Sequence, residues 1–159
     1  MKPIDYLETQ PEFDLFEYFD GEQQAWGVFV DRFGTLRKRF TVKIVGNVTD
    51  NLLKLEESFV YDDGSTQQRV WLINRVDKHN YTGTALDIVG EAKGQAYGSS
   101  LQWQYKMDLS INNKDWRVHF NDWMFLIDEE TLVNRAEVTK FGIKIGEVLL
   151  FFRKSVNHD

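Results

Sequence analysis

The chain has 159 residues with 42% hydrophobic content, including 12 Phe, 6 Tyr and 5 Trp, which suits one domain with a core of its own. Its 25 Asp and Glu outnumber 19 Lys and Arg, and without a basic run nucleic acid and an anionic membrane face are poor partners. The absence of cysteine excludes disulfides, thiolate nucleophiles and cysteine-ligated zinc. No window of about 18 apolar residues occurs, which excludes a membrane-spanning helix.

A short helix is predicted near the N-terminus. Phe13, Phe16 and Phe19 recur at three-residue spacing within the segment 12–21, which ends in glycine. This spacing, followed by a glycine, is typical of one or two helical turns with a glycine cap.

Most of the remaining chain alternates between apolar and polar residues, as half-buried β-strands do. The clearest run is 101–109, where Leu101, Trp103 and Tyr105 alternate with glutamine and lysine. Turn signals such as GNVTDN, YDDGS and INNKD separate the runs. We count about nine strands, the clearest of which are one opened by Trp26 and those in 40–44, 52–61, 69–76, 101–109, 116–128, 131–141 and 143–154.

Consecutive strands in a chain of this length predict an all-β fold. We expect a single antiparallel up-and-down barrel of about eight to ten strands, calycin-like or lipocalin-like in arrangement, because closure removes exposed sheet edges. A sandwich is the competing arrangement. Gly90, Gly94 and Gly98 lie four apart, which favours a barrel corner over a dinucleotide-binding loop. The predicted domain boundaries are 1–12 for an N-terminal tether, 13–154 for the barrel and 155–159 for a C-terminal tail.

The sequence contains few groups suited to metal or nucleophilic chemistry. His119 and Asp122 are three residues apart on a predicted strand, so they point to opposite faces and cannot chelate one metal together. No His-Glu-x-x-His or Gly-x-Ser-x-Gly motif occurs. We therefore assign no catalytic residue, metal or cofactor, although a Ser-His-Asp site assembled from distant segments stays open.

Several polar residues interrupt the apolar faces of predicted strands, namely Glu57, Asn74, Asp122, Asn134 and Glu147, with Arg32, Arg69, Arg75 and Arg135 nearby in sequence. Burying an unpaired carboxylate costs several kcal/mol, so these groups pair with each other, lie at strand ends near solvent, or line a cavity. A barrel of this size can hold one small ligand, and ligand sites typically combine apolar walls with a few polar groups. We favour the cavity, although each tryptophan taken singly also suits a core position. The predicted ligand-binding residues are Glu57, Arg69, Trp71, Trp103, Tyr105, Phe120, Asp122, Met124, Asn134, Arg135 and Glu147.

Seven segments carry a family resemblance: AWGVFVDRFG, FVYDDGSTQQRVW, YTGTALDIVGEAKGQAYG, LQWQY, NDWMF, NRAEVTKFGIKIGEV and FFRK. From about Phe13 to Lys154 the chain resembles the bacterial domain-of-unknown-function family 3833, in the family's own order. No activity is assigned to that family. Its members look like lipoproteins, with a signal peptide and a lipidated cysteine before this domain, and they are often encoded beside enzymes that modify membrane fatty acids.

This chain has neither a signal segment nor a cysteine. The resemblance implies a truncated mature lipoprotein on the periplasmic side of the bacterial envelope, lacking its N-terminal lipid anchor, or otherwise a cytoplasmic variant. Our leading hypothesis is a non-catalytic binding or carrier module for a lipid or other apolar small molecule. One alternative is a lipid-modifying enzyme with Glu57, Asp122 or Glu147 as acid or base. The other is a structural or interaction protein with a filled barrel.

Overall fold

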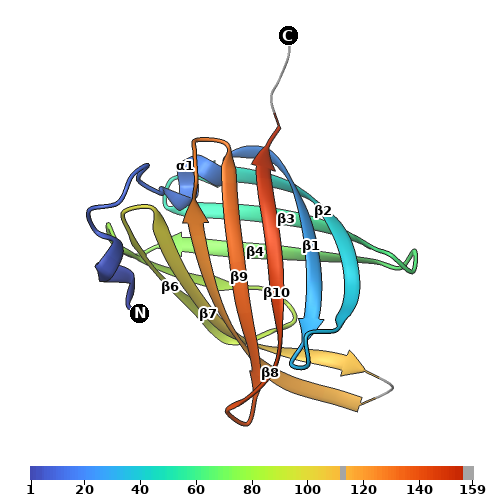
Figure 1. Cartoon of the computed structure of the whole chain (residues 1–159). Helices are drawn as coiled ribbons and strands as arrows, with labels where there is room; N and C mark the ends of the chain where they lie inside the picture. Colours follow the sequence, from blue (N-terminus) through green and yellow to red (C-terminus); the bar gives the residue numbers. More distant parts are fainter. Residues whose placement is uncertain (112–113, 156–159) are drawn as a thin grey trace.

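The protein folds into one closed β-barrel (Figure 1). The computed structural model describes residues 1–111 and 114–155. Ten antiparallel strands pair in the order β1-β10-β9-β8-β7-β6-β5-β4-β3-β2, and the pairing of β1 with β10 closes the sheet. The strands are β1 (Gly21–Asp31), β2 (Leu36–Thr49), β3 (Leu52–Tyr61), β4 (Thr66–Arg75), β5 (Asn80–Thr84), β6 (Ile88–Tyr97), β7 (Ser100–Ile111), β8 (Lys114–Leu126), β9 (Thr131–Lys140) and β10 (Ile143–Lys154). The predicted all-β barrel is confirmed, and the sandwich is wrong.

Alternation along each strand places one face inside the barrel. On β2, Val42 and Ile44 are buried while the residues beside them are exposed. On β9, Leu132 and Val138 are buried by the same alternation. The inward side chains form one continuous hydrophobic cluster around the barrel interior.

The segment 80–97 forms two strands that the apolar pattern does not reveal. On β6 the inward residues are small, including Ala92, Gly94 and Ala96, so their hydrophobic signal is weak. A Cβ on Gly94 would lie 2.5 Å from the ring of Trp103, which explains why this position carries no side chain. Gly90 has a φ of +69° where the register between β6 and β7 shifts, and this bend agrees with the predicted barrel corner.

One end of the barrel, which we call the helix end, is covered by the helix α1 (Leu15–Phe19) (Figure 1). The Asp14 carboxylate caps this helix by accepting hydrogen bonds from the N–H groups of Phe16 and Glu17. Asp14 also forms an ion pair of 2.9 Å with Arg75 of β4, which ties the helix to the barrel. The predicted short helix is therefore confirmed.

The segment predicted as a tether, 1–12, lies against the outside of the barrel. Its 3-10 helix η1 (Pro3–Tyr6) contacts β6 and β7, and the ring of Tyr6 packs on Phe125 with a centroid separation of 5.3 Å. Within the described residues, no helix has the length and apolar character needed to cross a membrane. Of the predicted tail 155–159, all but Ser155 lies outside the described residues.

Candidate ligand-binding cavity

The barrel encloses a cavity of about 300 Å³. It extends from Leu15 and Phe19 at the helix end toward Lys38 and Tyr61 near the opposite end, which we call the turn end because hairpin turns form it. Small-molecule sites in proteins begin at roughly this volume. The interior is therefore not packed solid, and the alternative of a filled barrel is wrong.

Aromatic side chains from neighbouring strands form the wall of the cavity. The ring of Trp71 meets Trp103 and Tyr105 edge to face, with centroid separations of 5.6 and 5.2 Å. Tyr105 in turn stacks on Phe120 at 5.0 Å. Such contacts add about 0.5–1.5 kcal/mol each beyond simple burial, so this wall is held in shape before any ligand arrives.

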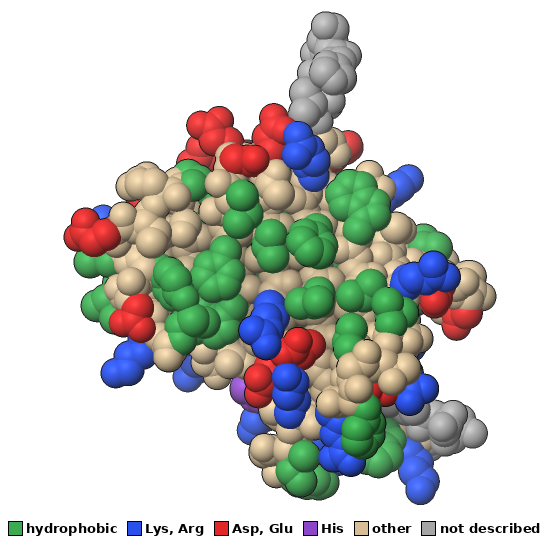
Figure 2. All heavy atoms as spheres, viewed as in Figure 1, with side chains coloured by type: hydrophobic (Ala, Val, Ile, Leu, Met, Phe, Trp, Pro, Cys, Tyr) green, Lys and Arg blue, Asp and Glu red, His purple; other side chains and the backbone are tan. Residues whose placement is uncertain are grey.

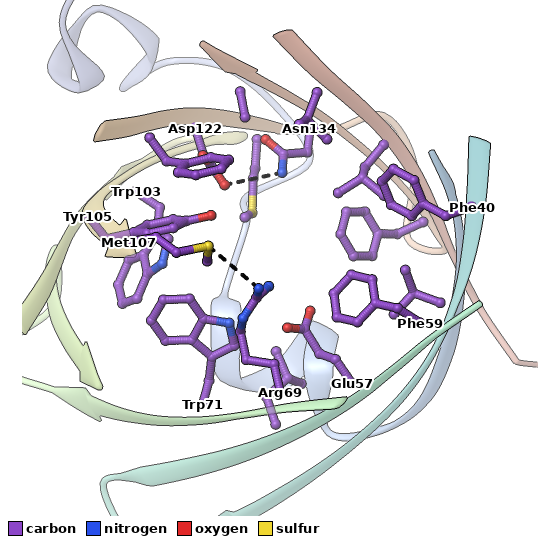
Figure 3. Close-up of a pocket in the computed structure, with 18 of the residues that line it drawn as sticks. Phe40, Glu57, Phe59, Arg69, Trp71, Trp103, Tyr105, Met107, Asp122 and Asn134 are labelled. Carbon is purple, nitrogen blue, oxygen red and sulfur yellow. Dashed lines mark hydrogen bonds between the residues drawn. The ribbon is translucent and has the colours of Figure 1, made fainter. Parts of the chain in front are cut away.

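Three polar side chains project into the cavity (Figure 3). Asp122 of β8 and Asn134 of β9 are 5% and 2% exposed, and the Asn134 amide donates a hydrogen bond of 3.4 Å to Asp122 Oδ2. Glu57 of β3 reaches in from across the cavity. All three come from inward positions of strands whose other inward residues are apolar.

Each of these side chains keeps one buried oxygen without a hydrogen-bond donor among the described residues: Glu57 Oε1, Asp122 Oδ1 and Asn134 Oδ1. Leaving a buried acceptor unpaired costs about 1–3 kcal/mol. A folded chain tolerates several such atoms in one place most readily where a bound molecule satisfies them.

Burial raises the pKa of Glu57 and of Asp122 to about 7 each. For Glu57, loss of hydration is the largest cause of the raised pKa, while the charge of Arg69 and the indole of Trp71 lower the pKa in part. For Asp122, loss of hydration is again the largest cause, opposed by the hydrogen bond from Asn134. Near neutral pH both groups therefore exchange between neutral and ionised forms.

Arg69 is the buried cation of the cavity, and its charge is already matched. Its guanidinium donates three hydrogen bonds of 3.0–3.2 Å to the carboxylate of Asp87, just before β6. It also donates to the sulfur of Met107 at 3.7 Å (Figure 3) and lies over the ring of Phe59. This bidentate pairing holds Arg69 in place and offsets its charge.

The structure brings together all the predicted ligand-binding residues except Arg135 and Glu147; those that line the cavity are Glu57, Arg69, Trp71, Trp103, Tyr105, Phe120, Asp122, Met124 and Asn134. Whether these residues bind a ligand stays a prediction.

The placement of Arg135 and Glu147 in the cavity is wrong. Both lie on the outer surface, where the Arg135 guanidinium and the Lys144 ammonium approach Glu147 at 2.6 and 2.7 Å. The hydrogen bond from Arg135 holds the pKa of Glu147 below its usual range. The register shifts between Lys144 and Gly146, so alternation counted from Ile143 assigns Glu147 to the wrong face. Asn74 is also exposed, because Trp71 and Ile73 occupy the inward face of β4.

The sequence does not identify several of the residues that line the cavity. Phe40, Phe59 and Met107 line the cavity from inward positions of predicted strands, so alternation marks them as buried but not as lining a space. Asp87 lies 18 residues from Arg69, and no local pattern links the two.

Solved structures share this barrel at low sequence identity. The S-type phycobiliprotein lyase CPES from Guillardia theta matches with a TM-score of 0.68 and 6% identity, over 91% of this chain and 92% of the lyase. A protein of unknown function from the DUF3598 family of Nostoc punctiforme matches with a TM-score of 0.63 and 10% identity, over 92% of this chain and 51% of that protein. At these identities the likeness shows the fold alone. No curated protein matches the chain, whereas the model of a family described as protein of unknown function (DUF3833) matches residues 1–154.

Proposed function

The chain belongs to the DUF3833 family of proteins of unknown function, and we propose that it is a non-catalytic binding or carrier protein for a lipid or other apolar small molecule. The cavity carries this proposal. It has an aromatic and aliphatic wall around a few convergent polar groups, which is the usual composition of a small-molecule site. The shared fold of a phycobiliprotein lyase supports the use of such a barrel for a small molecule.

The site of action that we propose is the periplasmic side of the bacterial envelope. The resemblance to a family of lipoprotein-like proteins supports it, because such proteins are held at the envelope by an N-terminal lipid anchor. Fractionation of cells producing the natural gene product, with a tag at its C-terminus, tests this location. Recovery in the cytoplasmic fraction would contradict it.

Native mass spectrometry of the purified protein, followed by organic extraction and lipid analysis, tests the binding function. We expect a complex with one apolar molecule, either co-purified or taken up on addition. The variant Ala136→Phe should abolish uptake, because Ala136 is buried in the cavity wall and a larger ring fills the space. The control Glu137→Phe places the same ring one residue along, on the exposed face. A folded protein that takes up no apolar molecule would refute the proposal.

A second candidate function is an enzyme that modifies a lipid inside the barrel. The observation in its favour is that the pKa values of Glu57 and Asp122 are about 7, which suits a general acid or base at neutral pH. Incubating the protein with the extracted lipid and following the lipid mass distinguishes the two functions. A lipid recovered unchanged after long incubation favours the carrier, while a product that disappears in Glu57→Gln or Asp122→Asn favours the enzyme.

A further inference from the structure

We infer that the ligand of the cavity carries a polar group that donates hydrogen bonds, such as a hydroxyl, amide or ammonium, and that apolar molecules ending in a carboxylate are selected against. This inference rests on the proposed binding function and names the chemistry of the ligand. It follows from the three acceptor oxygens on Glu57, Asp122 and Asn134.

The polar part of the cavity presents mainly acceptors to a ligand. Glu57 Oε1, Asp122 Oδ1 and Asn134 Oδ1 are buried and unpaired among the residues that the structure describes. The Asn134 amide N–H is directed at Asp122, so its carbonyl oxygen remains for the ligand. The donors that line the same space, such as the Tyr105 hydroxyl and the indoles of Trp71 and Trp103, carry no charge. A ligand hydroxyl or N–H group therefore complements this region.

The charge balance of the cavity opposes an anionic ligand. Its buried cation, Arg69, is bidentate to Asp87, so two of its nitrogens are already occupied. When Glu57 and Asp122 are ionised, negative charges exceed positive ones within this cluster. Lys38 lines the cavity near the turn end, where its ammonium lies over the Tyr61 ring, on a different strand from these carboxyls. A fatty acid carboxylate beside Glu57 and Asp122 would meet like charge in a poorly hydrated space.

Three probes of equal chain length test this inference: ω-bromoundecanol, ω-bromoundecanoate and bromoundecane. Bromine quenches tryptophan fluorescence on contact, and Trp71 and Trp103 stand in the cavity wall. At about pH 8 we expect the alcohol to bind at least about tenfold more tightly than the carboxylate, which corresponds to one or two well-placed hydrogen bonds and the avoided repulsion. The difference in affinity between the alcohol and the carboxylate should decrease at about pH 5, where carboxyls of both probe and protein take up protons.

The three probes separate failure of the inference from failure of the proposed function. Binding of none of them contradicts a binding function for apolar molecules. Equal binding of all three keeps that function and overturns the inference, as does tightest binding of the carboxylate. In the double variant Glu57→Gln and Asp122→Asn, discrimination between alcohol and carboxylate should fall to within about threefold. The outer-surface variant Glu147→Gln should keep the full discrimination.

A different observation, on the outer surface, carries a second inference. We propose that the turn end of the barrel docks on a bilayer containing anionic phospholipid. Phe33, Leu36, Phe141 and Ile143 are 77%, 48%, 92% and 60% exposed there, and we call these four residues the apolar rim. Phe33 and Phe141 lie in the β1–β2 and β9–β10 turns, and Leu36 and Ile143 begin the strands that follow them. The two turns are neighbours because β1 pairs with β10. Exposed apolar side chains gathered on adjacent turns mark an interaction surface.

The backbone at Phe141 supports a role for the exposed ring. Phe141 has a φ of +51° and Gly142 one of +76°, a left-handed pair that Asn-Gly or Asp-Gly adopts with less strain. Phenylalanine is disfavoured at this position, both because its backbone is left-handed and because its ring is exposed. Packing within the barrel does not offset these two costs. Strain of this kind gathers at functional positions.

Basic side chains accompany the apolar rim. The Arg32 guanidinium lies over the Phe33 ring at 4.7 Å, and the Lys140 ammonium lies 5.2 Å from the Phe141 centroid. The helix end is acidic instead, with Asp128, Glu129 and Glu130 on its β8–β9 turn. Figure 2 shows acidic side chains at the top of the view and a mixture of hydrophobic and basic ones at the bottom. The net charge of −6 averages over both ends, so it does not describe the turn end.

Co-sedimentation with vesicles tests this docking surface. We expect binding to vesicles with about one third phosphatidylglycerol and little binding to phosphatidylcholine alone, with a decrease as salt rises. The double variant Phe33→Asn and Phe141→Asn should weaken binding at least about fivefold, and asparagine suits the backbone at 141. The control Phe151→Asn removes a ring that is 52% exposed on β10, toward the helix end, and should bind as the parent does. The proposal would be overturned if the double variant bound vesicles as tightly as the Phe151→Asn control does. It would also be overturned if the double variant lost self-association of the protein but kept its vesicle binding.

Discussion

Asp87 sets the charge that the cavity offers to a ligand. Its carboxylate is bidentate to Arg69, and the two side chains are 30% and 12% exposed. In Asp87→Asn the Arg69 charge is left facing Glu57 and the cavity. We expect a loss of about 2 kcal/mol in the free energy of unfolding, less than for a fully buried pair because Asp87 is partly hydrated. We also expect tighter binding of ω-bromoundecanoate, measured by tryptophan quenching.

Asp108→Asn is the matched control for this change. The Arg117–Asp108 pair uses the same two guanidinium nitrogens, at 2.9 and 3.2 Å, but its side chains are 60% and 45% exposed on the outer wall. Exposed pairs contribute little, so the urea midpoint of unfolding should stay close to that of the parent and ligand preference should stay the same. If the two variants behave alike, the pairing of Arg69 does not control the cavity.

At the scale of elements, the contact between α1 and β2 closes the helix end. Gly46 of β2 lies directly under the carbonyl group of Phe19, where any Cβ would collide with the backbone. In Gly46→Ala the end of the helix must move away, and we expect a cost of about 2 kcal/mol. Because Leu15 and Phe19 line the cavity, ligand release should also be faster, which stopped-flow quenching measures.

Val45→Ala is the control for the Gly46 variant. Val45 precedes Gly46 on β2 but faces outward with 39% exposure. Its truncation should change the free energy of unfolding by no more than about 0.5 kcal/mol and leave the release rate as it was. Faster release in both variants would mean that β2 as a whole, rather than its contact with α1, limits ligand exit.

The sequence predicts elements well where alternation is carried by large side chains. The run around Trp103 identifies β7, and Phe16 and Phe19 identify α1. β6 is missed because its inward positions are alanine and glycine, which make room for Trp103 and so leave no apolar stripe. The face of Glu147 is mistaken because a bulge shifts β10 by one residue, and the bulge has no local signature. Pairing at a distance, as between Arg69 and Asp87, depends on closure of the barrel and is visible only in the structure.

At the scale of the whole molecule, the barrel holds carboxyl groups in two environments, which have opposite effects on how stability depends on pH. Inside, burial raises the pKa of Glu57 and Asp122 to about 7. Outside, hydrogen bonds hold carboxyl pKa values below their usual range, from Arg37 for Asp31 and from Ser65 for Asp63. The outer groups stabilise the fold above their ordinary pKa and lose that contribution as the pH falls through their lowered values. The inner groups have the opposite effect, because their contribution to stability is lost as the pH rises.

The inner carboxyls therefore predict a protein that is most stable near pH 5. Between about pH 4.5 and 7, the native state keeps protons on Glu57 and Asp122 that the unfolded state releases, so stability falls as pH rises through this window. Above about pH 7 both states are ionised and the loss is complete, at about 3 kcal/mol for Glu57 and about 4 kcal/mol for Asp122. Urea unfolding at pH 5 and at pH 8 should show a clearly higher midpoint at pH 5. The double variant Glu57→Gln and Asp122→Asn should remove most of that difference, because neither amide titrates. A parent protein that is more stable at pH 8 would show that these carboxyls are ionised throughout, in which case the cavity must supply donors that compensate them.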